Sequence, residues 1–162
     1  MTVTLNATEV FEIAQQIERN GSMFYRKAAE LFSESDISNK FLELADWEIR
    51  HEKVFKDIGQ EIIKPNKNRT TSNLKKKEFD PKLMACLAVF GTVSDPIYKL
   101  KSITKITEAL KAAIEKEKDT IVFYEGLKDF VIDRNNQNKV DVIIKEEKHH
   151  IEILNQALKQ RE

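Results

Sequence analysis

The fold is decided by a short stretch of sequence, Glu48-Ile49-Arg50-His51, and by its counterpart Glu147-Lys148-His149-His150. In both stretches a histidine follows a glutamate by three positions, so on a helix the two side chains point the same way from adjacent turns. Glu48 and Glu147 are 99 positions apart, and so are His51 and His150. The two stretches therefore indicate an internal repeat of two similar helical segments.

The sequence around these pairs predicts four helices. Apolar residues recur in steps of three and four on either side of each pair, the spacing that buries one face of a bundle helix. All three prolines lie between residues 65 and 96, so the middle of the chain is broken. We predict helices over about 7–32, 36–59, 104–131 and 136–160, which form two hairpins joined by a crossover over 60–103.

Local signals mark several helix ends. Asn6, followed three residues later by Glu9, predicts a capping box at the start of the first helix. Gly59 is expected to end the second helix. Asp80-Pro81 predicts the start of a short peripheral helix over 81–90, with Asp as cap and Pro in the first helical position.

The composition favours one domain, 1–162, because 162 residues enclose a single core but are few for two. Lys plus Arg and Asp plus Glu both total 27, so we expect no nucleic-acid partner. Nothing resembles a signal peptide or a membrane span, which predicts a cytoplasmic protein with no membrane partner. Cys86 lies in an apolar run and is expected to be a buried, inert thiol.

The predicted buried stripes are apolar except near their middles. Glu18 and Glu117 interrupt the first and third helices, again 99 positions apart, and the two Glu-x-x-His pairs interrupt the others. Within each hairpin the two glutamates lie equally far from the turn, roughly 20 Å along the helix axis. We therefore expect six side chains to meet at one depth: Glu18, Glu48, His51, Glu117, Glu147 and His150.

Such a cluster predicts a metal site. Four carboxylates and two imidazoles in an apolar interior are strongly disfavoured unless cations compensate them. Two divalent ions match four ionised glutamates, and oxygen-rich ligation with one nitrogen per ion suits iron or manganese better than structural zinc. We predict two iron ions, with manganese as the alternative. A single Glu-x-x-His pair is usually solvated, but two pairs and two single glutamates in register argue against that interpretation.

Two tyrosines share the stripes of the single glutamates. Tyr25 follows Glu18 by seven positions, and Tyr124 follows Glu117 by the same interval. Their hydroxyls are candidates to hydrogen-bond a ligating carboxylate and orient it. Plain aromatic packing in the core is the alternative.

Some neighbours of the predicted ligands are less informative. Gly21 could leave space for an oxidant or permit close helix packing, and Thr120 is a candidate to support a ligand. Glu146 and His149 lie off the stripe, so we expect Glu146→Ala to leave metal binding almost unchanged and His149 to be no ligand.

These motifs resemble the ferritin-like superfamily and, within it, the rubrerythrin-like di-iron carboxylate proteins. The resemblance is carried by Glu18 with Phe24-Tyr25, by Glu117 with Phe123-Tyr124, and by the two Glu-x-x-His pairs. Ferritin-like di-iron sites combine two single glutamates with two such pairs. The resemblance implies an all-α, ferritin-like four-helix bundle made of two helical hairpins with one long crossover, commonly a homodimer.

The sequence departs from rubrerythrin proper in two ways. A rubredoxin domain binds iron through four cysteines, and these 162 residues contain one cysteine. The resemblance therefore implies an external electron donor, such as a rubredoxin-type protein. Rubrerythrins also place an extra carboxylate near the single glutamate of the third helix, where Ile114 and Ile121 stand here.

Three functions fit the sequence. The first is a rubrerythrin-like di-iron protein that reduces hydrogen peroxide or dioxygen. The second is a ferroxidase or iron-handling protein, and the third is a non-catalytic helical module with structural metals. The segment 64–77 carries six basic and no acidic residues, which predicts a solvated loop or, alternatively, a docking patch for an acidic partner.

Overall fold

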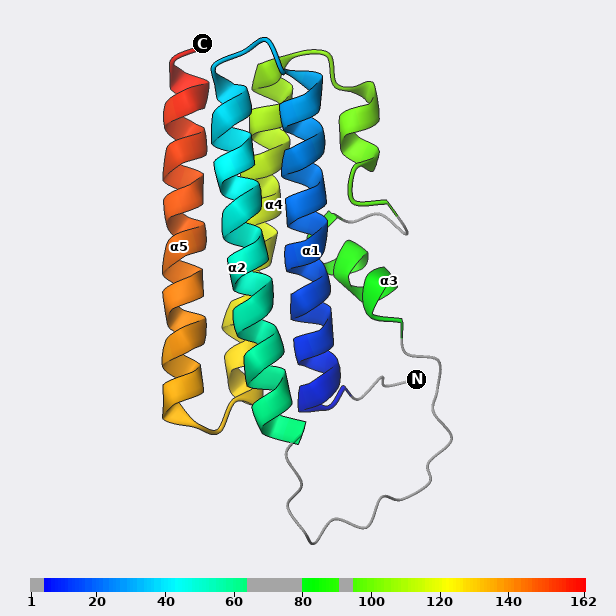
Figure 1. Cartoon of the computed structure of the whole chain (residues 1–162), viewed down its shortest axis with the longest axis vertical. Coiled ribbons are helices and arrows are strands. Elements are labelled where there is room, and N and C mark those ends of the chain that lie inside the picture. The colour runs from blue at the N-terminus through cyan, green and yellow to red at the C-terminus, as the bar shows by residue number, and fades with distance from the viewer. Residues whose placement is uncertain (1–4, 64–79, 91–94) are drawn as a thin grey trace, which may run out of the picture.

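A computed structural model of the protein describes residues 5–63, 80–90 and 95–162 (Figure 1). Four long helices stand side by side: α1 (Ala7–Leu31), α2 (Ile37–Ile63), α4 (Ile106–Leu127) and α5 (Arg134–Lys159). Short elements complete the described chain: α3 (Pro81–Ala85), the π-helical turn η1 (Cys86–Phe90), and the 3-10 helices η2 (Tyr98–Ser102) and η3 (Lys128–Phe130). The predicted basic segment 64–77 lies outside the described residues.

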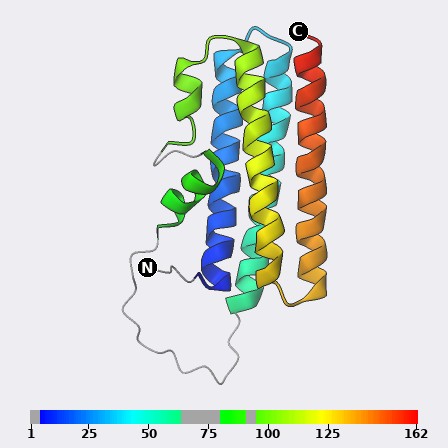
Figure 2. The same cartoon turned by 180° about the vertical axis from the view of Figure 1, so that it is seen from behind.

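The long helices form two hairpins that pack into a bundle. α1 packs most extensively on α2, and α4 on α5, while smaller α1–α4 and α2–α5 contacts join the hairpins (Figure 1). The crossover elements α3 and η1 pack on α1 and α4, on the side of the bundle away from α5, as Figure 2 shows from behind. The predicted all-α four-helix bundle with a peripheral helix in its crossover is confirmed.

Side-chain caps start the helices where the sequence placed them. Asn6 accepts a hydrogen bond from the Glu9 backbone N–H at 3.0 Å, and the Glu9 carboxylate accepts one from the Asn6 N–H at 2.9 Å. Asp80 caps α3, with Pro81 in the first helical position. Each cap satisfies backbone donors that the first helical turn leaves unpaired.

Other helix ends differ from the prediction for physical reasons. α2 passes through Gly59 to Ile63, and Gly59 is buried, with a Cβ added there 3.5 Å from Cβ of Phe11. The glycine thus lies on the face of α2 that packs against α1 and not at an exposed helix end. α5 begins at Arg134, since Asp133 accepts a hydrogen bond from the Asn136 N–H. α4 ends at Leu127 and tightens into η3.

The core follows the predicted stripes. The stripe residues of α2 and α5 are all buried: Phe41, Leu44, Glu48, His51, Phe55 and Ile58 on α2, and Val140, Ile143, Glu147, His150, Leu154 and Ala157 on α5. The stripes of α1 and α4 end in half-buried residues, Phe32 directly after α1 and Ile106 on α4, and are otherwise buried. Cys86 is buried, as predicted, and its sulfur accepts a hydrogen bond from the Asn20 side chain at 3.7 Å. Burial raises the pKa of this thiol. The crossover therefore closes the α1–α4 side of the core.

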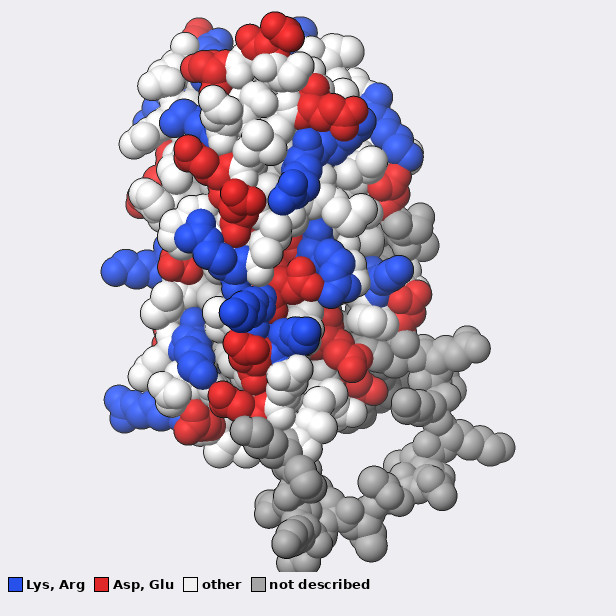
Figure 3. Space-filling view, viewed as in Figure 1, with Lys and Arg blue, Asp and Glu red and all other residues white. Residues whose placement is uncertain are grey.

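The surface carries charges of both signs. On the face formed by α1, α2 and α5, basic and acidic side chains are interspersed (Figure 3). Among the helices that the structure describes, none combines the length and apolarity needed to cross a membrane.

Candidate metal centre

All six predicted ligands lie together in the middle of the bundle. Each long helix contributes, because a polar residue on every apolar stripe must point at the common axis. None of the six is more than 2% exposed. The contributors are Glu18 from α1, Glu48 and His51 from α2, Glu117 from α4, and Glu147 and His150 from α5.

Their ligand atoms converge in two groups that share Glu147. In each group, one oxygen or nitrogen atom per residue lies within 4.8 Å of the others. The first group contains Glu48, Glu117, Glu147 and His150, and the second contains Glu18, His51 and Glu147. Two adjoining groups with a common carboxylate are compatible with a site for two metal ions.

Glu147 stands between the two imidazoles. Its Oε1 atom lies 3.1 Å from Nδ1 of His51, and its Oε2 atom lies 2.8 Å from Nδ1 of His150. The rings themselves are stacked, with centroids 5.8 Å apart. One carboxylate can therefore reach both halves of the cluster without moving.

Several buried atoms in the cluster lack a hydrogen bond of good geometry to any described residue, although some lie within ion-pair distance of a neighbour. They are Glu18 Oε2, both oxygens of Glu48, Glu147 Oε2 and both ring nitrogens of His150. Leaving such atoms unsatisfied is costly in a protein interior. All of them are ligand types that iron and manganese accept, so the residues fit the predicted metals.

The two tyrosines bind carboxylates across the α1–α4 interface. The hydroxyl of Tyr25 donates to Oε1 of Glu117, and that of Tyr124 donates to Oε1 of Glu18. Both rings are fully buried and also pack on phenylalanines, Tyr25 on Phe41 and Tyr124 on Phe55. The two interpretations of these tyrosines are therefore compatible, since each ring packs in the core while its hydroxyl holds a carboxylate.

Lys116 is the member of the cluster that sequence reasoning missed. Its side chain is 1% exposed, and its Nζ atom lies 3.1 Å from Glu48 and 3.2 Å from Glu117. The ammonium also lies 4.8 Å from the ring centroid of Tyr25. Lys116 is one position off the stripe, so the stripe alone does not mark it as buried. The repeat offered a signal, because the equivalent residue 99 positions earlier is the apolar Ile17, which the structure shows to be fully buried.

The neighbours of Lys116 resolve two further expectations. A Cβ at Gly21 would lie 2.2 Å from the Glu48 carboxylate and 2.8 Å from Nζ of Lys116, so these two side chains fill the space beside the glycine. The hydroxyl of Thr120 donates to the backbone carbonyl of Lys116 at 2.9 Å and thus bonds within its own helix rather than to a ligand.

Glu146 also joins the site, contrary to expectation. Its Oε2 atom lies 2.9 Å from Nε2 of His51, on the side of the ring away from Glu147. His149 is exposed and pairs with Glu152 on the surface, as its off-stripe position suggested. Glu146 is one-third exposed, so its long side chain reaches inward from the edge of the α2–α5 interface.

Trp47 connects the imidazoles with the surface. Its ring centroid lies 6.2 Å from that of His51 and 5.9 Å from that of His150, and the Arg50 guanidinium lies 4.0 Å above its ring. The residue is partly exposed and is the single tryptophan of the sequence. Its fluorescence can therefore report events at both histidines.

Charges and burial act against each other within the cluster. Burial raises the pKa of Glu18, and it raises that of Glu48 well above its usual range although Lys116 opposes this. Burial acts on Glu147 too, but the imidazoles outweigh it and hold its pKa well below the usual range. For His150 burial opposes protonation, yet neighbouring carboxylates raise its pKa to about 9. The anionic form of Glu147 is thus favoured more than those of Glu18 and Glu48.

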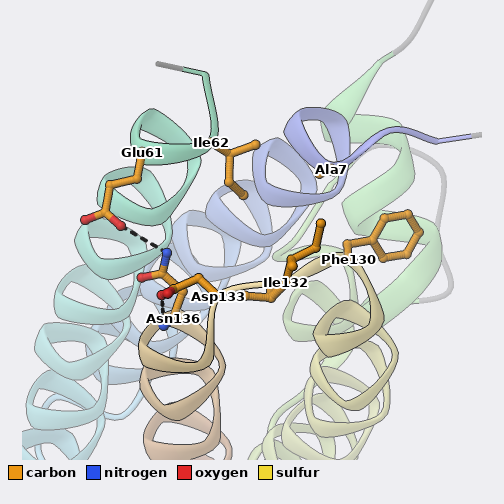
Figure 4. A pocket seen from close by; sticks show the side chains of 8 residues that line it. Ala7, Glu61, Ile62, Phe130, Ile132, Asp133 and Asn136 are labelled. Carbon is orange, nitrogen blue, oxygen red and sulfur yellow. Dashed lines mark hydrogen bonds between the residues drawn. The ribbon is translucent and has the colours of Figure 1, made fainter. Parts of the chain in front are cut away.

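A separate surface pocket lies at one end of the bundle, where α1 begins and α2 ends (Figure 4). Its volume is about 550 Å³, and Ile62, Phe130 and Ile132 form part of its wall. Asn136 donates to Glu61 at its rim. Ala7, also in the wall, precedes Glu18 by eleven residues, roughly 16 Å along α1. This pocket is therefore remote from the carboxylates.

Comparisons with known proteins agree with this geometry. A family model described as rubrerythrin matches residues 9–158. Among solved structures, the chain is similar to the crystal structure of a candidate ferritin-like diiron-carboxylate protein from Thermotoga maritima. The two chains are 25% identical, the match covers 100% of each, and the TM-score is 0.70. A search of curated proteins found no match.

Proposed function

The chain belongs to the rubrerythrin family, and we propose that its buried cluster binds two iron ions with which the protein reduces hydrogen peroxide or dioxygen. The observation that carries the proposal is the pair of ligand groups joined by Glu147. One ion would be held by Glu48, Glu117, Glu147 and His150, and the other by Glu18, His51 and Glu147.

The protein's own part in this reaction is to position ligands and exclude water. Bound ferrous iron supplies one electron per ion, so two ions match the two electrons that, with two protons, convert hydrogen peroxide into two water molecules. Tyr25 and Tyr124 would each hold a proton at the hydroxyl and keep one oxygen of Glu117 and Glu18 fixed. Fixed ligands with free coordination positions are what a catalytic metal site requires.

The electrons for repeated turnover would come from a donor outside these residues. With Cys86 as the one cysteine, the sequence offers no four-cysteine iron site of its own. Trp47 supports entry of electrons on the α2 face, because its ring contacts both imidazoles and is partly exposed. A rubredoxin-type protein is the donor that we propose, acting on a homodimer of this chain.

Metal analysis followed by peroxide titration tests the proposal. Protein from its native host, purified without added metal, should contain two iron ions per chain. After anaerobic reduction, one equivalent of hydrogen peroxide per chain should oxidise both ions, and a reductant should restore them for further cycles. A preparation without transition metal, or oxidation without renewed turnover, would contradict the proposed activity. Iron uptake beyond two ions per chain, with a cage detected by light scattering, would indicate iron storage instead.

A further inference from the structure

The buried ammonium of Lys116 divides the cluster into two unequal halves. Both of its ion pairs, to Glu48 and Glu117, fall in the half that also contains His150. Glu18 and His51, which with Glu147 form the other half, are not among its ion-pair partners in the described structure. One half therefore already has a positive charge among its ligand atoms.

A divalent ion in the Lys116 half would need the same oxygens as the ammonium. Glu48 Oε2 and Glu117 Oε2 lie 3.1 and 3.2 Å from Nζ, so an ion bound to these carboxylates would lie a few ångströms from a like charge. At that distance, inside a protein, two positive charges repel strongly. Lys116 and the ion must compete unless the lysine side chain withdraws.

The space for the ammonium is built by two paired departures from the internal repeat. Where the first hairpin has Ile17, the second has Lys116, and where the second has Thr120, the first has Gly21. Gly21 on α1, which has no side chain, thus faces the ammonium of Lys116 on α4, since a Cβ at Gly21 would lie 2.8 Å from Nζ. The bundle therefore has space for the lysine side chain at the position of Gly21.

We propose that Lys116 is a resident counter-cation of Glu48 and Glu117, and that metal enters their half of the cluster only by displacing it. The two halves then fill in order, the one containing Glu18 and His51 first. This inference rests on the proposed binding of two metal ions. At low metal concentration, Lys116 would therefore limit how many ions the protein binds.

Metal titration of neutral variants tests this proposal. Chelator-stripped protein is titrated anaerobically with Fe²⁺ alone, followed by Trp47 fluorescence and calorimetry. The wild type should bind two ions in well-separated steps. Lys116→Met and Lys116→Gln should both tighten the weaker step at least about tenfold, because each removes the competing charge. Lys118→Met is the matched control, since Lys118 is exposed and pairs with Glu115.

A second readout separates competition from a packing role. Removing the counter-cation should lower the thermal midpoint of the stripped variants below that of the wild type, and saturating Fe²⁺ should largely remove this difference. Identical two-step titrations for wild type and both Lys116 variants would overturn the proposal while leaving metal binding intact. Failure of the wild type to bind Fe²⁺ would overturn the proposed function and the competition with it.

Discussion

The Nε2 atom of His51 on α2 lies 2.9 Å from Oε2 of Glu146 on α5. Its Nδ1 atom faces Glu147 at 3.1 Å and Glu18 at 3.5 Å, and with Nε2 donating to Glu146 the Nδ1 lone pair would be free for a bound metal ion. A carboxylate in this position sets the tautomer of a metal-binding imidazole and increases its basicity. Glu146 therefore supports the site although it is not on the buried stripe.

Glu146→Ala should weaken metal binding in the half that contains His51. The loss of a supporting carboxylate typically lowers metal affinity about 10–100-fold. Competition with a chelator, read by Trp47 fluorescence, measures this affinity. Glu152→Ala is the control, because Glu152 pairs with the exposed His149 outside the cluster. Equal metal affinities for Glu146→Ala and wild type would show that Glu146 does not support the site, as its position off the stripe predicted.

Glu147→Ala should remove both metal ions, whereas Glu18→Ala and Glu117→Ala should each mainly empty one half. Glu147 is the residue common to the two ligand groups, and each of the other glutamates belongs to one. The measurement is metal content per chain after dialysis against limiting iron. An exposed glutamate of the same helix as Glu117, Glu115, provides the control variant. Retention of one ion by Glu147→Ala would show that it does not bridge.

Tyr25→Phe and Tyr124→Phe should destabilise the metal-free protein by about 1–2 kcal/mol each, because each leaves one buried carboxylate oxygen without its hydrogen bond. Urea unfolding of stripped protein gives this free energy. Tyr98→Phe should change it little, since Tyr98 is 60% exposed. No loss of stability in either buried variant would mean that packing on Phe41 and Phe55, rather than the hydroxyl, is what these tyrosines provide.

The ion pair between Asp36 and Arg161 should make stability depend on pH in the acid range. A hydrogen bond from Arg161 lowers the pKa of Asp36, so the carboxylate stabilises the fold above its unfolded pKa of about 3.9. This contribution disappears as the pH falls through the lower, folded pKa. Thermal midpoints of wild type and Asp36→Asn should therefore differ slightly at pH 6 and converge as the pH falls through the folded pKa of Asp36. A constant difference across this range would contradict the linkage.

Much of the architecture could be predicted from local sequence signals. The three-four spacing of Phe41, Leu44, Phe55 and Ile58 defines the buried face of α2 without reference to any other helix. The caps at Asn6 and Asp80 could also be predicted locally, since each capping side chain and the N–H that it binds lie within three residues of each other. The end of α2 could not be predicted in this way, since Gly59 lies inside the helix and faces Phe11 of α1.

The sequence by itself determined the repeat, the stripes and the six side chains that meet inside the bundle, because helical periodicity places Glu18, Glu48 and their counterparts on faces that must be buried. Only the tertiary structure decided what else reaches them. Lys116 and Glu146 lie beside the stripes, and their long side chains enter the cluster from the α1–α4 and α2–α5 interfaces. Such contacts depend on the rotation and spacing of neighbouring helices, which no local pattern encodes.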